Sequence, residues 1–228
     1  QLRIADGAPA GFVDMARHAL GSIGDLSAGT VKIESADVSI EGTAASPDTY
    51  RTLLRDHGRP LPAGWRGRLA VRPAEGLPFT FGAELEPGRV VLTGHVPDEA
   101  TRTRVLDAAR RSLPGQALQD DTKIASGADP RFADLVAFAL ERAADLSFGR
   151  IALSGTDVRM EGRARSPEAY SALTTASVPG GSVTADVRPP LVQPFDFALV
   201  VEPDSVTMTG FVPSAEALDD LAASLPES

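Results

Sequence analysis

The side chains most able to perform acid–base or metal chemistry in this sequence are three histidines, His18, His57 and His95. Histidine changes charge near neutral pH and is a frequent metal ligand, so a catalytic or metal site would bring these residues together. They fall instead in separate predicted elements, and two of them correspond to Phe138 and Phe211 in an internal repeat described below. The pattern therefore predicts no metal site, no cofactor and no catalytic residues.

Two pairs of adjacent carboxylates occur, Asp120 with Asp121 and Asp219 with Asp220. Paired carboxylates can serve as acid and base when their surroundings separate their pKa values, but each pair here is predicted at a loop or a helix end, where solvated charge is expected. The chain contains no cysteine, which excludes a disulfide framework and a thiolate metal site. The sequence also shows neither a nucleophile-elbow serine nor a dinucleotide-binding glycine loop.

The densest basic cluster lies on a helix predicted over residues 98–113 and consists of Arg102, Arg104, Arg110 and Arg111. One interpretation is a solvated helix face, because acidic residues stand beside these arginines. The other is a surface that contacts the headgroups of anionic lipids. The formal net charge of the chain is −9, and binding to nucleic acid is not expected, because neutralising phosphates needs a basic face.

Aromatic residues offer a second kind of binding candidate. Trp65 is the only tryptophan and lies in a loop that is longer than its repeat counterpart. It is a candidate surface anchor for a neighbouring protein or an interfacial lipid, the alternative being that it covers the local core. Tyr50 and Tyr170 occupy equivalent places early in two predicted helices, where the ring is expected to pack on a sheet and the hydroxyl to face water.

A strand–glycine–helix motif that occurs four times must position these side chains. Its clearest copy runs from Gly88 to Pro97, where alternating residues precede Gly94 and a helix begins at Asp98. Alternation predicts a strand with one buried face, and a glycine near its end predicts a close approach of another backbone. The Asp or Ser beside a proline then predicts the helix start. The motif glycines are Gly42, Gly94, Gly162 and Gly210.

The motif belongs to a longer internal repeat. Many residues between Ile4 and Leu53 recur 120 positions later, and many between Phe79 and Pro97 recur 116 positions later. The difference between the two shifts falls in the loop before a strand predicted at 183–187, where insertions are tolerated. Such a repeat predicts several small modules rather than one large domain.

The predicted modules are of two kinds. A full module has the order helix, strand, strand, helix, strand, and a shorter one lacks the leading helix. The predicted boundaries are 1–7 for the final strand of a preceding module, 8–73 for module 1, 78–125 for module 2, 128–189 for module 3 and 194–228 for module 4, whose last strand is missing. A turn is expected over 24–29. Because residues 1–7 match the strand tail at 121–127, either the sequence is cut from a longer array or this strand completes the last sheet of another copy, by head-to-tail self-association.

The motif, with Val90, Leu92, Gly94 and Val96 in its clearest copy, resembles the BON domain. The tandem arrangement is similar to the periplasmic N-terminal region of proteobacterial OmpA-like proteins. The resemblance implies an α+β fold, a tandem array of modules with helices packed on one face of three-stranded mixed sheets. It also implies a periplasmic location, a parent protein associated with the outer membrane, and interaction with phospholipid or with other envelope proteins. Nothing in the sequence matches the peptidoglycan-binding domain of that family.

Three functional hypotheses follow. The first is a non-enzymatic cell-envelope module that acts as a spacer and a docking repeat. The second is a phospholipid-binding module that uses the basic helix or the loop around Trp65. The third, an enzyme, would require a deep pocket lined by histidines or carboxylates. No apolar run in the sequence reaches the ~18 residues that a transmembrane helix requires.

Overall fold

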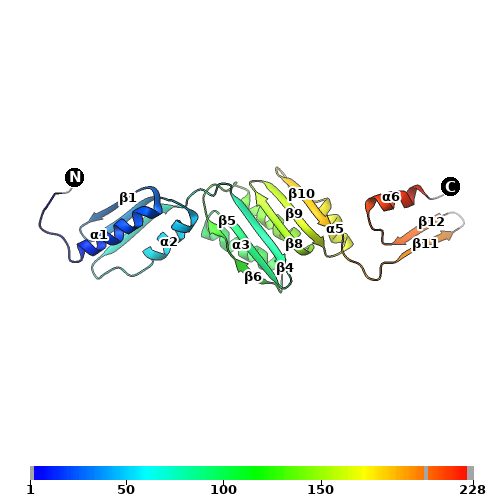
Figure 1. The fold of residues 1–228 in the computed structure, drawn as a ribbon, viewed down its shortest axis with the longest axis horizontal. Coiled ribbons are helices and arrows are strands. Elements are labelled where there is room, and N and C mark those ends of the chain that lie inside the picture. The colour runs from blue at the N-terminus through cyan, green and yellow to red at the C-terminus, as the bar shows by residue number, and fades with distance from the viewer. Residues whose placement is uncertain (1–2, 203–204, 225–228) are drawn as a thin grey trace. The chain divides into compact units, whose positions relative to one another are not determined.

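Six α-helices and twelve β-strands make up most of the chain in the computed structural model, which describes residues 3–202 and 205–224 (Figure 1). The fold is α+β, as the resemblance implied. The chain divides into two compact units, one ending at Pro189 and one beginning at Pro190. Within the described ranges, no helix combines the length and apolar character needed to cross a membrane.

The N-terminal part of the first unit contains the predicted full module. Its elements are α1 (Phe12–Gly21), a 3-10 turn (Ser22–Asp25), β1 (Leu26–Glu34), β2 (Asp37–Ala44), α2 (Pro47–His57) and β3 (Arg66–Arg72). The sheet has the order β1-β2-β3, with β1 antiparallel to β2 and β2 parallel to β3. The predicted three-stranded mixed sheet is present here. The turn expected over 24–29 is wrong, because β1 already begins at Leu26, which pairs with Ala44.

The helices that follow each motif begin where the capping residues predict. The Ser46 hydroxyl accepts a hydrogen bond from the Thr49 amide, and the Thr49 hydroxyl accepts one from the Ser46 amide, so two free helix donors are satisfied. The Asp98 carboxylate accepts from the Thr101 amide at 2.6 Å, and this bond holds the pKa of Asp98 below its ordinary value. Ser166 and Ser214 cap the two later helices in the same way.

The next two predicted modules share one sheet. Their elements are β4 (Thr80–Glu86), β5 (Arg89–Val96), α3 (Glu99–Ser112), β6 (Ala117–Asp120), β7 (Lys123–Ile124), α4 (Phe132–Ala143), β8 (Leu146–Ser154), β9 (Asp157–Ala164), α5 (Pro167–Thr174) and β10 (Ser182–Arg188). The seven-stranded sheet has the order β10-β9-β8-β4-β5-β6, and β7 also pairs with β5. Separate three-stranded sheets for 78–125 and 128–189 are therefore a wrong prediction. Residues 79–188 are called the central domain below.

The joint between the two halves of the central domain is the antiparallel pair β4 and β8, in which Ala83 lies opposite Ile151. Helix α4 packs against α3, β4 and β8, so it covers the joint. One hydrophobic core extends through both halves and includes Leu92, Leu140 and Leu153. The half that lacks a leading helix in its sequence thus obtains its cover from α4, which belongs to the next repeat.

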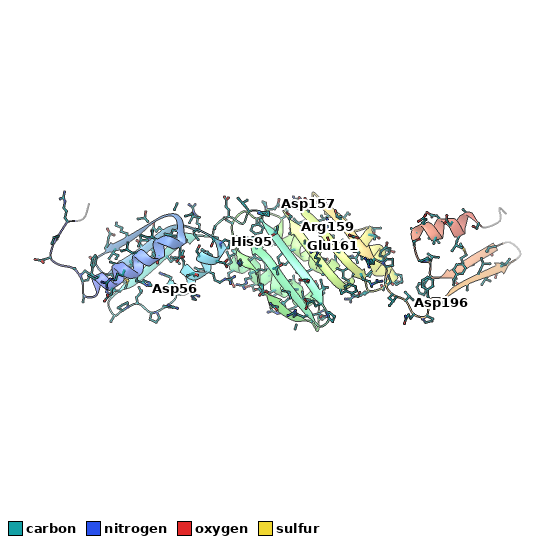
Figure 2. The ribbon with its side chains drawn as sticks, in the orientation of Figure 1. Asp56, His95, Asp157, Arg159, Glu161 and Asp196 are labelled. Atoms are coloured by element: carbon teal, nitrogen blue, oxygen red, sulfur yellow. The ribbon has the colours of Figure 1, made fainter. Side chains whose placement is uncertain are left out.

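Helices cover one face of this sheet and leave the other polar. In β9, Val158 and Met160 are buried, while Asp157 and Arg159 point to the opposite, exposed face. Figure 2 shows Arg159 and Glu161 along the same strand, where the Glu161 carboxylate pairs with Arg159 and with Arg150 of β8. These partners hold the pKa of Glu161 below its ordinary value. This alternation matches the period-two pattern of the sequence.

The connector between module 1 and the central domain contacts the segment that follows β7 of the central domain. Glu75 forms an isolated bridge with Ser126, and the Gly76 amide donates to the Ser126 carbonyl at 3.0 Å. An ion pair of 2.7 Å joins Lys123 of β7 to Asp48 of α2, and the hydrogen bond from Lys123 lowers the pKa of Asp48.

The second unit contains β11 (Phe197–Glu202), β12 (Ser205–Gly210) and α6 (Ala215–Ala223), and β11 and β12 form an antiparallel pair. At the other end of the chain, the strand predicted within residues 1–7 is not formed by its described part. Arg3 and Ile4 have no strand pairing, and Ile4 is fully exposed. The equivalent residues of β7 pair with β5. Gln1 and Leu2 lie outside the described residues.

Candidate functional site

A groove of about 640 Å³ between α3 and α4 is the surface at which the predicted basic residues gather. It lies where the two helices pack across the joint of the central domain. Apolar atoms of both helices form its floor, and charged side chains of α3 and Asp134 of α4 stand around it. The residues lining it are Arg104, Val105, Asp107, Ala108, Arg110, Arg111, Ala133, Asp134, Val136 and Ala137.

Arg102 does not belong to this groove. Its Nε donates to Asp120 Oδ2 at 2.7 Å, and both side chains are largely buried against β6. Burial alone would raise the pKa of Asp120, but hydrogen bonds from Thr122 and Arg102 outweigh it, so the pKa lies below the ordinary aspartate value. The pair therefore fastens α3 to the sheet, and the predicted cluster of four arginines divides into one structural residue and three surface residues.

The three arginines of the groove differ in their partners. Arg110 pairs with Asp107 at 3.0 Å, whereas Arg104 donates to the Thr101 hydroxyl and Arg111 to the Asp107 carbonyl. Among the described residues, neither Arg104 nor Arg111 pairs with a carboxylate. Two guanidinium groups beside an apolar floor can accept a phosphate or a carboxylate together with an acyl segment. The two aspartates of the groove weaken that attraction.

A second hollow, of about 290 Å³, lies between α1 and α2 in module 1 and is lined by His18 and His57. Its floor is apolar, with Met15 and Leu53 buried beneath it. Within the part of the chain that is described, no three histidine, aspartate or glutamate side chains lie close enough to hold a metal ion. The two histidines thus share a hollow, which their places in different predicted elements did not indicate.

His95 lies at the end of β5 (Figure 2). Its ring packs on Phe79, with ring centroids 5.6 Å apart. Its Nδ1 is buried and has no hydrogen-bond partner among the described residues. Burial, with a smaller contribution from Lys123, lowers the pKa of His95. In the second unit Phe195 and Phe211 form the equivalent ring pair, so His95 occupies the place of an aromatic residue, Phe211.

Trp65 was a candidate surface residue, and the structure corrects that expectation. The side chain is 8% exposed and packs in a small core with Met15, Ala19 and Val38. Its Nε1 donates to the Ala10 carbonyl at 3.0 Å, which ties the loop before β3 to the segment before α1. Trp65 therefore closes the core of module 1, which was the alternative reading of its sequence context.

The motif glycines occupy equivalent places in four hairpins, and no residue with a Cβ would fit there. Gly94 has φ of +87°, and a Cβ on it would overlap the backbone of Thr80 on the neighbouring strand. Gly42, Gly162 and Gly210 meet the backbone of the adjacent strand in the same way. These glycines allow the close approach of the hairpin strands.

The carboxylate pairs have separate roles. Asp120 is fixed by Thr122 and Arg102, whereas Asp121 is exposed and accepts from the Gln119 side chain. Asp219 and Asp220 are exposed on α6. Neither pair is arranged as a catalytic acid and base, because no two of these carboxylates share a buried setting.

β1 and β11 are edge strands that carry apolar residues. Among the described residues, β1 lies at the edge of the sheet of module 1 and pairs with β2. Within the same described ranges, β11 pairs with β12 alone. An unpaired strand exposes a row of backbone donors and acceptors that another strand can bind. The sequence predicted a docking edge at residues 1–7. In the structure, the strands β1 and β11 also have free edges.

The segment containing β5, α3, β6 and β7 is the part of the chain that matches a known protein family. Residues 88–126 match the model of the BON-like domain family. The predicted resemblance is confirmed for this segment, which includes Gly94 and the arginines of α3. A search of curated proteins gives no match. The tandem repetition of BON-like modules and the relation to OmpA-like proteins stay predictions.

The sequence also contained signals that pattern reading missed. Thr101 and Thr122 are the buried polar residues of the BON-like segment. Thr122 donates to Asp120 through both its amide and its hydroxyl, at 3.0 and 2.6 Å. A Thr two residues after an Asp in a strand pattern is the signal for such a local turn. It explains why the chain between Ala117 and Ile124 forms two strands, β6 and β7.

Proposed function

We propose that this chain is a non-enzymatic spacer and docking segment of a bacterial cell-envelope protein that works in the periplasm and resembles the OmpA-like family. The observation that carries the proposal is the joint between β4 and β8, where successive repeats combine into one sheet with one core. Repeats that fuse in this way form a rigid length of chain, and unpaired edges of the same kind form docking sites. The BON-like match supports the assignment to an envelope module.

The docking part can be tested in cells with a photoreactive amino acid placed at a strand edge. Thr30 lies on the exposed face of β1, which has an open edge, and its repeat equivalent Arg150 lies on β8, whose edges are both occupied. We expect protein adducts from position 30 and few from position 150, in the full-length protein at its natural level. Equal labelling at the two positions would contradict a docking role for the edge.

The compartment is tested by protease access. A periplasmic segment becomes sensitive to added protease when only the outer membrane is permeabilised, and a cytoplasmic one stays protected until the inner membrane is broken. Protection in the first condition would contradict the proposed location.

A second candidate function is phospholipid binding, and the groove between α3 and α4 favours it. Arg104 and Arg111 flank an apolar floor and, among described residues, pair with no carboxylate. This use of the groove would resemble headgroup binding by clustered basic residues, worth about 1 kcal/mol per arginine near an anionic surface.

Co-sedimentation with vesicles separates this candidate from the first. Vesicles with and without phosphatidylglycerol are mixed with the wild type, the double variant Arg104→Ala with Arg111→Ala, and Arg68→Ala as a control outside the groove. Loss of sedimentation in the double variant alone supports lipid binding at the groove. No sedimentation of the wild type removes this candidate and leaves the docking function standing.

A further inference from the structure

The repeat makes the central domain a template for the two ends of the chain. Module 1 is equivalent to the second half of the central domain at a shift of 120 residues, so β1 corresponds to β8 and α1 to α4. The C-terminal unit is equivalent to the first half at a shift of 116 residues, so β11 corresponds to β4 and α6 to α3. Module 1 therefore has the equivalents of β8 and α4, which form one side of the joint in the central domain. The C-terminal unit has the equivalent of β4, which forms the other side.

The half-joint in module 1 has an open apolar face. Helix α4 is fully covered in the central domain, where Leu140 is 0% exposed and Phe132 is 3% exposed. The same positions of α1 are Leu20 at 63% and Phe12 at 39%. The uncovered side chains are those that in α4 face α3 and β4, and both of those neighbours are absent from module 1.

The half-joint in the C-terminal unit is open in a complementary way. In β4, Phe81 and Ala83 are each 3% exposed because α4 and β8 cover them. Their equivalents in β11, Phe197 and Leu199, are 46% and 48% exposed. β11 is thus an exposed apolar strand with an unpaired edge. A strand of this kind can pair with the free edge of β1 and pack against the exposed face of α1.

We propose that the C-terminal unit of one molecule docks on module 1 of a second copy of this chain, so that β11 adds antiparallel to β1 in the register of β4 and β8. This proposal specifies the partner for the docking function proposed above. Carried over from the central domain, the register places Phe197 opposite Ile33, Leu199 opposite Val31 and Val200 opposite Thr30. The contact is heterologous, so copies join head to tail into open chains.

The residues on each face agree with this register. Leu199 and Val31 stand where Ala83 and Ile151 are buried, under the α1-like helix. On the polar face, Val200 and Thr30 stand where Glu84 and Arg150 lie, both exposed. The partner's N-terminal residues fit the same template, because Arg3 and Ile4 correspond to Lys123 and Ile124, which pair with the end of β5.

Engineered disulfides test the register, and the chain has no native cysteine to interfere. Thr30→Cys and Val200→Cys are made in separate molecules, mixed and oxidised at a moderate redox potential. We expect a cross-linked dimer from this mixture. The matched control combines Thr30→Cys with Ala198→Cys, which lies two residues out of register on the same face, and should cross-link at least about tenfold less. Equal cross-linking of the two mixtures, or none in either, would overturn the proposed pairing.

The double variant Thr30→Cys with Val200→Cys in one molecule tests whether β11 pairs with β1 of a second copy or with β1 of the same molecule. Head-to-tail joining predicts a ladder of dimers, trimers and longer species that grows with protein concentration. A closed monomer as the main product would overturn the proposal in favour of pairing within one molecule.

Substitutions on the two faces of β11 give an independent measurement by light scattering. Leu199→Glu places a charge on the face that docking would bury, and it should abolish the concentration-dependent rise in mass. Val200→Glu introduces the residue that β4 has at the equivalent position, and it should retain the rise. Because Leu199 is half exposed in the single chain, the first variant should remain folded by circular dichroism. A wild type that stays monomeric to millimolar concentration would overturn the proposal.

These results distinguish this inference from the docking function on which it rests. If the wild type is monomeric while the photoreactive residue at position 30 captures a different protein in cells, self-association fails and docking stands. If neither experiment detects a partner, both fail.

Discussion

Helix α1 of module 1 and helix α4 of the central domain occupy equivalent positions in the repeat but have different environments. Met15 and Ala19 are buried in one, and their equivalents Leu135 and Ala139 are buried in the other, because both helices pack on their own sheet. Leu20 is exposed, whereas Leu140 is fully buried. The difference comes from β4 and α3, which pack against α4, whereas among the described residues α1 packs mainly on β1 and the 3-10 turn.

The comparison teaches that each repeat closes only part of its hydrophobic layer by itself. The side chains that face its own sheet are buried in both copies. The side chains that face a preceding repeat are buried only where that repeat is present. Stability in such a chain is therefore shared between neighbours, as in other repeat proteins.

The largest expected effect comes from truncating the equivalent leucines. Leu140→Ala should lower the free energy of unfolding by about 2–5 kcal/mol, because it leaves a cavity in the core. Leu20→Ala should lower it by less than about 0.5 kcal/mol in dilute solution, where its side chain stays in water. Urea titration followed by circular dichroism measures both. Equal losses would show that the two helices have similar surroundings in solution.

The second prediction uses the motif glycines of the two halves. Gly94→Ala should destabilise the central domain by roughly 1–3 kcal/mol, because its φ is positive and the new Cβ meets the backbone of β4. Gly210→Ala should instead loosen only β11 and β12. Hydrogen exchange read by mass spectrometry separates the two, with faster exchange confined to 197–224 in the second variant. Faster exchange in the central domain of that variant would contradict the division into units.

The third prediction concerns Asp120, which pairs with Arg102 of α3; the repeat equivalent of Arg102 in α6 is Leu218, which cannot form such a pair. Asp120→Asn should cost about 1 kcal/mol at neutral pH, by weakening the bonds with Arg102 and Thr122. Asp121→Asn is the exposed control and should cost almost nothing.

The pH dependence of this effect has a definite sign. Because the pKa of Asp120 is lowered on folding, its contribution is present above the ordinary aspartate value near 3.8 and is lost as the pH falls below it. The difference between wild type and Asp120→Asn should therefore shrink in acid. A difference that stays constant to pH 2 would assign the effect to shape rather than charge.

The smallest predicted effect sharpens the comparison of His95 with Phe211. The pKa of His95 is lowered on folding, so the unfolded chain binds its proton first and stability falls as the pH drops through about 6.5. His95→Phe removes this loss and the buried nitrogen that has no described partner. We expect a gain of about 1 kcal/mol at pH 5 and less at pH 8, from urea titrations at both values. A larger gain at pH 8 would contradict the burial argument.

The sequence was sufficient for the elements and the repeat because those depend on local patterns. Alternation before Gly94 and the capping residues at Ser46 and Asp98 act within a few residues, and the structure has the strands and helices they predict. The α+β class and the three-stranded sheet of module 1 were implied by the resemblance that rests on these patterns.

The joining of two modules and the division of the arginine cluster could not be read in the same way. Pairing of β4 with β8 depends on contacts between residues about 70 positions apart, with Phe81 opposite Leu153, and no local pattern specifies them. Arg102 and Arg104 lie on the same helix and differ in the direction of their side chains. The direction of Arg102 is set by its bond with Asp120, which lies on β6, further along the sequence. Burial of Trp65 likewise depends on Ala10, in a segment far from it in sequence.

The strand directions in the central domain have a mechanical consequence. β4 is antiparallel to β8, β8 is antiparallel to β9, and β9 is parallel to β10, so β4 and β10 run the same way. The chain enters at Thr80, the start of β4, and leaves at Arg188, the end of β10, so the two attachment points lie at opposite ends of the sheet. Tension along the polypeptide would load the interstrand hydrogen bonds in shear, where they must break together instead of opening one by one. A segment held between two anchored layers would resist stretching for that reason.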